Sequence, residues 1–124
     1  MKILPPTLRD GRRYLAFELI AEGPVKRDDL IREIFSAAGS LLGDVGASEC
    51  AIRLLAFEDM KGVVRCSPER TSNTRAVLAT IRDVRGTRVL FHVLGISGTV
   101  RAATKKYLAG VDVFNPVEQS HINE

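Results

Sequence analysis

The hydrophobic pattern at the start of the chain predicts a strand followed by a helix. Residues 13–20 (RYLAFELI) form an apolar and aromatic run that ends at a Glu-Gly-Pro break, which is typical of a buried strand. Residues 27–43 then place apolar side chains at the spacing of one helix face. Asp28 and Asp29 suit the first turn of this helix and Gly43 suits its end.

The middle of the pattern predicts a hairpin and a second helix. Residues 48–58 and 61–67 have the composition of two strands, and the Asp-Met-Lys-Gly sequence predicts the turn between them. Ser67 and Pro68 predict a helix start, with serine as the cap and proline at the first helical position. Apolar residues continue at helical spacing to residue 84.

A last strand and a short helix complete the pattern. Residues 87–97 form another apolar run, and residues 99–108 have helical spacing. The sequence before residue 13 contains a prolyl pair and an Asp-Gly turn, and the sequence after residue 108 has no periodicity. We therefore divide the chain into an N-terminal arm at 1–12, one domain at 13–108 and a C-terminal tail at 109–124.

The order of these elements predicts an α+β fold. A β-α-β-β-α-β order with an extra C-terminal helix is that of ferredoxin-like and RNA-recognition-motif (RRM) domains. Right-handed crossovers would give a sandwich in which two helices cover one face of a four-stranded antiparallel sheet. Strand 13–20 is apolar on both faces, so we expect its second face to be covered as well. The cover would be another protein or the C-terminal helix, through Val100, Tyr107 and Leu108.

Charge is distributed unevenly along the chain, although the net charge is only +3. Residues 61–108 carry ten Lys or Arg and two acidic residues, whereas residues 1–60 are net −2 and residues 109–124 are net −3. Such a basic block is typical of a protein that binds nucleic acid. Arginine outnumbers lysine 13 to 5, and its guanidinium group binds phosphate in a bidentate manner.

The clearest candidate site is the sequence GISGTVRAATKKYL at residues 95–108. A glycine-containing break precedes a short helix whose charged residues are all basic. The amides of a helix start favour anions, and Gly98 lets the backbone approach a ligand closely. Arg101 and Lys105 share one helix face, with no acid to offset them. The stretch therefore predicts phosphate binding, and the alternative is a solvated basic surface.

No group of residues predicts catalysis or metal binding by this chain. Its two histidines lie in a strand (His92) and in the tail (His121), and its adjacent acids are explained by helix starts and turns. Cys50 and Cys66 lack metal-ligand spacing and are too few for a disulfide framework. We expect no catalytic residue, no metal site and no cofactor bound by the chain. Base stacking on the sheet is not predicted either, because Tyr14 and Phe17 of the first strand fall on opposite faces.

The sequence also bears on localisation. No apolar run approaches the length of a membrane span, and the start MKILPPTLRD has a prolyl pair where a signal peptide needs a longer apolar stretch. We expect a soluble, cytoplasmic protein without membrane association.

Three stretches, in order and spacing, resemble a known family. The sequences LPPTLRDGRRYLAFEL, GVVRC and LGISGTVRAATKKYL are similar to those of the small RRM-like protein subunit of archaeal ribonuclease P, called ribonuclease P protein component 2, which the eukaryotic enzyme also contains. The resemblance spans residues 4–108, and its most specific part is Leu-Gly-x-Ser-Gly-Thr followed by a basic helix.

This resemblance implies an accessory role in a ribonucleoprotein. The complex removes the 5′ leader of precursor tRNA, with the active site and its magnesium ions in the RNA subunit. The protein subunit would stabilise that RNA, meet precursor tRNA only indirectly and bind a TIM-barrel protein subunit, as a homodimer within a heterotetramer. We expect RNA contacts from the arm, the central strands and the last helix, namely Arg9, Arg12, Arg13, Lys61, Arg65, Ser97, Gly98, Thr99, Arg101, Lys105 and Lys106.

Two other functions stay open at the level of the sequence. The first is a generic nucleic-acid-binding ferredoxin-like domain of a ribosomal or regulatory protein, which lacks the three motifs in register. The second is a small-molecule sensor or metabolic enzyme of the same fold, which needs a polar pocket with titratable groups. The sequence shows no such group, so the registered motifs favour the ribonuclease P subunit.

Overall fold

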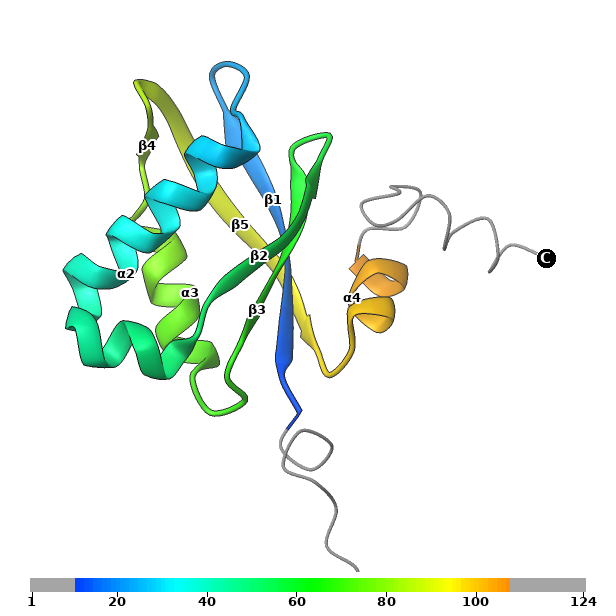
Figure 1. Cartoon of the computed structure of the whole chain (residues 1–124). Helices are drawn as coiled ribbons and strands as arrows, with labels where there is room; N and C mark the ends of the chain where they lie inside the picture. Colours follow the sequence, from blue (N-terminus) through cyan, green and yellow to red (C-terminus); the bar gives the residue numbers. More distant parts are fainter. Residues whose placement is uncertain (1–10, 108–124) are drawn as a thin grey trace, which may run out of the picture.

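The structure of the protein, a computed structural model, describes residues 11–107. Five strands form one sheet in the order β2-β3-β1-β5-β4, and every pair of neighbours is antiparallel. The strands are β1 (Arg13–Ala21), β2 (Arg53–Glu58), β3 (Lys61–Cys66), β4 (Asp83–Val84) and β5 (Thr87–Ser97). The helices are α2 (Arg27–Cys50), α3 (Thr71–Thr80) and α4 (Val100–Tyr107). Figure 1 shows α2 and α3 on one face of the sheet and α4 on the other.

The α+β class is confirmed, but the sheet has five strands and not the four predicted. The extra strand is β4, whose residues the sequence pattern assigned to the second helix. Arg85 and Gly86 both have positive φ, 51° and 89°, which is the backbone of a tight two-residue hairpin turn. Val84 is 2% exposed and belongs to the core. Because Val84 is apolar and buried, it fits the pattern of a helix as well as that of a short strand.

Helix α2 is longer than predicted. Gly43 does interrupt it, with φ of 77° and ψ of 173°, but the helix resumes beyond this kink and ends at Cys50. The resumed segment carries Cys50 into the core, where it is 1% exposed. The strand predicted from residue 48 consequently begins only at Arg53.

Helix α3 begins at Thr71, after the predicted serine cap. The Ser67 hydroxyl donates a hydrogen bond of 2.8 Å to the Glu49 carbonyl at the end of α2, so it does not cap α3. The Arg70 guanidinium meets the Glu49 carboxylate at 3.0 Å beside it. These contacts join α2 to the start of α3.

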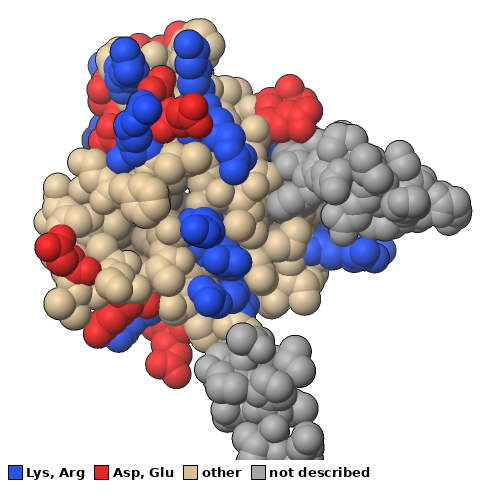
Figure 2. All heavy atoms as spheres, in the orientation of Figure 1, with Lys and Arg blue, Asp and Glu red and all other residues tan. Residues whose placement is uncertain are grey.

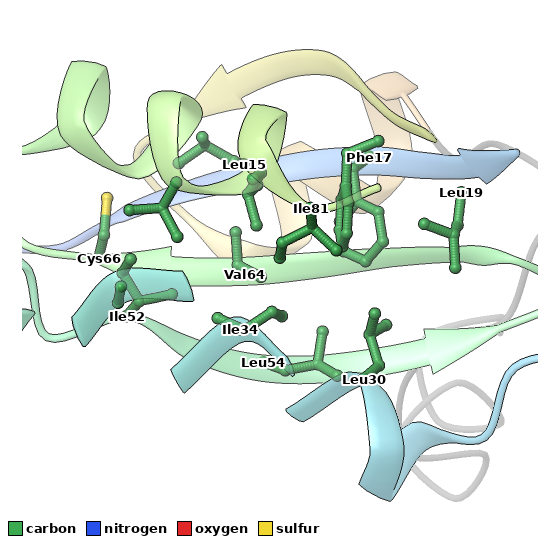
Figure 3. Packing of buried hydrophobic residues seen from close by; sticks show 14 of the residues in the cluster. Leu15, Phe17, Leu19, Leu30, Ile34, Ile52, Leu54, Val64, Cys66 and Ile81 are labelled. Atoms are coloured by element: carbon green, nitrogen blue, oxygen red, sulfur yellow. The ribbon is translucent and has the colours of Figure 1, made fainter. Parts of the chain in front are cut away.

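The main core lies between the sheet and the helices α2 and α3. Figure 3 shows the side chains of Leu15, Phe17 and Leu19 along β1 among the buried residues of this core, as the sequence predicts for this face. Phe17 is fully buried, and its ring centroid lies 4.9 Å from that of Phe91. Gly62 on β3 makes room for it, because a Cβ there would lie 2.8 Å from the Phe17 ring. The side chains of β1 therefore lie at the centre of the main core.

The second face of the sheet is partly covered by α4, as predicted. Tyr14 and Ala16 of β1 pack in a separate apolar cluster with Ala103 and Tyr107 of α4. Tyr107 is thus confirmed as a covering residue, Val100 is not part of the cluster, and Leu108 lies outside the described residues. Ile20, expected on this face, is 51% exposed and pairs with Leu90, which is 50% exposed. Within residues 11–107, no helix has the length and apolar character needed to cross a membrane.

Both cysteines are free thiols in the core, and we predict that they do not react in the native protein. Burial raises the pKa of the Cys50 and Cys66 thiols above the ordinary value of 9.0, although the Thr74 hydroxyl acts in the opposite direction. A thiol reagent at about pH 8 should label neither cysteine in buffer and both in denaturant. Rapid labelling of the native chain would contradict this.

The raised pKa values of the two thiols also predict that the stability of the fold decreases at alkaline pH. The unfolded chain loses its thiol protons at the ordinary pKa, 9.0, before the folded chain does. The free energy of unfolding should therefore decrease as pH rises above that value, and replacing both cysteines with alanine should reduce the decrease. Urea titrations on either side of this pH measure the effect.

Candidate nucleic-acid interface

Helix α4 is fixed to the sheet by two side chains. Ala103 is fully buried against the small residues Ala16, Ala56 and Val63. The Tyr107 ring lies so close to Gly95 of β5 that any Cβ at this position would overlap it. A glycine is therefore required in β5 for the helix to pack, and the packing directs the opposite helix face to solvent.

The start of α4 is capped by a threonine side chain. The backbone N–H of Ala102 donates a hydrogen bond to Thr99 Oγ1 at 3.1 Å. Gly98 is exposed, and a Cβ built on it would meet no atom within 4 Å. The backbone before the helix is therefore open to a ligand, next to the positive end of the helix dipole.

The exposed face of α4 is basic. Arg101 and Lys105 are exposed, and no ion pair joins them to an acid between residues 11 and 107. Lys106 is exposed too, with its Nζ 5.7 Å from the centroid of the Tyr107 ring, so it also interacts with the anchoring aromatic side chain. This face presents positive charge on a rigid element, as phosphate binding requires.

The sheet face under α4 is organised in rows that run across the strands. The middle row consists of small residues, Ala56, Val63, Ala16 and Gly95, and supports the helix. On one side of it, a row runs through Arg53, Arg65, Tyr14 and Ser97, and the first two of these residues are basic. A row on the other side alternates in sign, in the order Glu58, Lys61, Glu18 and His92.

These rows separate the predicted strand residues Lys61 and Arg65. Lys61 lies opposite Glu18 and Glu58, which offset its charge, and Glu18 Oε1 lies 3.6 Å from His92 Nδ1. Arg65 lies opposite Tyr14, next to the end of β5 from which α4 starts. An RNA contact by Lys61 stays a prediction. Arg65 lies in the same row as Ser97, which is another predicted RNA contact.

The other predicted contacts lie near the start of β1 or outside the structure's range. Arg12 is exposed, and Arg13 begins β1 and donates a hydrogen bond to the Arg12 carbonyl at 3.1 Å. Arg9 lies outside the described residues. Arg53 is not predicted as a contact by its local sequence, and only the hairpin register brings it opposite Arg65.

Several other arginines have acidic partners. Asp29 pairs with both Arg32 and Arg85, at 3.2 and 3.7 Å, and Glu49 pairs with Arg70. Figure 2 shows basic and acidic side chains interleaved at one end of the molecule, whereas a stripe of Lys and Arg over β2 and β3 has no acidic neighbour. Positive charge without an acidic neighbour is therefore present over β2 and β3 in this view, in addition to the exposed basic face of α4.

Comparison with known proteins identifies relatives along the whole domain. The sequence profile of the Rpp14/Pop5 family matches residues 13–108. Ribonuclease P protein component 2 of Methanosarcina acetivorans is 53% identical over 116 residues, covering 94% of this chain and 88% of the relative. The Methanosarcina mazei protein of the same name is 51% identical over 115 residues, covering 93% and 99%. That of Pyrococcus horikoshii is 35% identical over 111 residues, covering 88% and 92%.

A solved structure has a similar fold. A chain in the cryo-EM structure of yeast ribonuclease MRP superposes with a TM-score of 0.63, covering 99% of this chain and 92% of that chain. The two sequences are 10% identical, so this likeness concerns the fold.

Proposed function

Because this chain belongs to the Rpp14/Pop5 family, we propose that it is an RNA-binding protein subunit of ribonuclease P, the endoribonuclease that removes the 5′ leader of precursor tRNA. The observation that carries this proposal is the high identity, over most of both chains, to proteins called ribonuclease P protein component 2. It favours this role over that of a generic ribosomal or regulatory protein of similar fold.

In this proposal the chain supports catalysis and the RNA subunit performs it. The RNA subunit holds the magnesium ions, and the protein binds its backbone through Arg101, Lys105 and the open backbone at Gly98. The exposed basic face of α4 supports this role, since cations on a fixed helix neutralise phosphates. Arg65 would extend the contact along the sheet, and Arg12 and Arg13 would add contacts at the start of β1. The chain would meet precursor tRNA only indirectly.

We also propose protein partners, namely a TIM-barrel subunit of ribonuclease P and a second copy of this chain. Apolar side chains support this part of the proposal. Phe35 and Val45 on α2 are 62% and 73% exposed, and a groove between α2 and the edge strand β2 is lined by Ile31, Phe35 and Leu55. We place this assembly in the cytoplasm. We interpret the four longer strands as a ferredoxin-like sheet to which β4 is an addition.

Reconstitution tests the proposed function. The RNA subunit with the other protein subunits should cleave precursor tRNA faster when this chain is added. The RNA-free chain should cleave none, because catalysis belongs to the RNA subunit. A complex that works equally well without the chain would contradict its role as a subunit. Magnesium-dependent cleavage by the pure, RNA-free protein would contradict its accessory role.

A further inference from the structure

Two arginines lie directly opposite each other on the hairpin formed by β2 and β3. The register pairs Arg53 with Arg65, so their side chains leave the same face of the sheet as neighbours. Like charges in this position repel each other, so the pair is destabilising in the absence of a ligand. The pair therefore calls for an explanation in terms of binding.

No acid within residues 11–107 forms an ion pair with either arginine. Arg65 Nε is buried and has no hydrogen-bond partner. Buried polar groups in folded proteins nearly always have a partner, so an orphaned guanidinium nitrogen indicates that part of this site is missing from the isolated chain. A negatively charged hydrogen-bond acceptor beside the pair would satisfy the guanidinium donors and offset their charge.

The same strands show that this imbalance is local. At the other end of the hairpin, Lys61 lies between Glu58 on β2 and Glu18 on β1, so charges alternate in sign there. Both rows are on one sheet face, and the small residues under α4 separate them. The sheet face therefore has neighbouring cations without acidic partners in one row only, among the residues that the structure describes.

The rest of the arginine row leads toward α4. Tyr14 and Ser97 continue it on β1 and β5, and Ser97 ends β5 immediately before the open backbone at Gly98. Neighbouring strands lie about 4.8 Å apart, so two spacings place Arg65 about 10 Å from Ser97 and three place Arg53 about 14 Å from it. These distances separate the pair from the start of α4, although all of these residues lie on the same sheet face.

We propose that Arg53 and Arg65 together bind a single phosphodiester of the RNA backbone, at a site separate from the one at α4. The inference rests on the proposed function and adds Arg53 and the ligand group to it. Two guanidinium groups provide parallel N–H donors for the two free oxygens of a phosphodiester. The negative charge of that phosphate removes the repulsion between the arginines, which the fold alone leaves in place.

The test uses the full chain, the RNA subunit and the double variant Arg53→Gln/Arg65→Gln. A shared phosphate predicts that the slope of log affinity against log salt flattens by about 0.9, the value for one phosphate contact. Urea unfolding should show equal or greater stability, because the variant removes a like-charge pair. The matched control is Arg32→Gln/Arg70→Gln, whose arginines already have acidic partners, and its slope should stay at the wild-type value.

The possible outcomes separate this inference from the proposed function. A slope that flattens by about 1.8 would mean two phosphates and overturn the shared site. An unchanged slope would also overturn it, and if the variant then failed to assemble with the other protein subunits, the ligand would be an acidic side chain of a partner. If the wild-type chain bound the RNA subunit no better than an unrelated RNA and added nothing to cleavage, the proposed function itself would fail.

Discussion

Replacing Arg101 and Lys105 with alanine should weaken binding of the RNA subunit and flatten the slope of log affinity against log salt by about one to two units. Both side chains project from the exposed face of α4, and each phosphate that they neutralise releases counterions. The fold should hardly change, since surface substitutions usually shift stability by about 0.5 kcal/mol or less. Titrations at several salt concentrations and urea unfolding measure the two effects.

The control for this pair is Lys26→Ala/Arg82→Ala. Lys26 precedes α2 and Arg82 lies in the groove beside α2, so both are exposed cations on the helical side of the sheet. Arg27 is less suitable, because its Nη2 donates to the carbonyls of Leu54 and Leu55 at 3.4 Å and helps to hold the edge of β2. Equal slopes for the two double variants would show that α4 is only a solvated basic helix.

The sequence predicts those elements whose hydrophobic pattern has one interpretation. Strands β1 and β5 are long apolar runs and lie where the pattern places them. Residues around Val84 are different, because an apolar side chain that points at the core fits the end of a helix and a short hairpin strand equally well. Gly43 breaks α2 as predicted, but the helix resumes to bring Cys50 into the core, a tertiary effect that local spacing does not contain.

The candidate site also has one part that the sequence predicts and one part that it does not. Local sequence is enough for α4, because its cap, its basic face and the open glycine lie within a few residues. The alignment of Arg53 with Arg65 depends on a hairpin register that shifts between Leu54 and Ala56, so it becomes visible only in three dimensions. The sequence therefore shows that both strands contain arginine, but only the register shows that Arg53 and Arg65 are neighbours.

The fit between Gly95 and Tyr107 should decide whether α4 stays on the sheet. A methyl group at Gly95 overlaps the tyrosine ring, so Gly95→Ala should displace the helix and reduce the free energy of unfolding by about 1–3 kcal/mol, as overpacking does. Amide hydrogen exchange should accelerate in residues 100–107 and stay slow in β1 and β3, whose main core faces the other helices. RNA affinity should fall too, because Arg101 and Lys105 lose their fixed position.

Two further variants show whether the overlap is the cause. Gly98→Ala makes the same change where a Cβ meets no atom within 4 Å and where φ is not positive, so stability should be kept or raised by about 0.4–1 kcal/mol. Tyr107→Ala removes the ring, and in that background Gly95→Ala should cost little, which gives a non-additive double-mutant cycle. Additive costs would mean that Gly95 acts through the strand itself. Protection of α4 that persists in Gly95→Ala would mean that the helix is held by Ala103 and the small residues beneath it, with the tyrosine as a secondary contact.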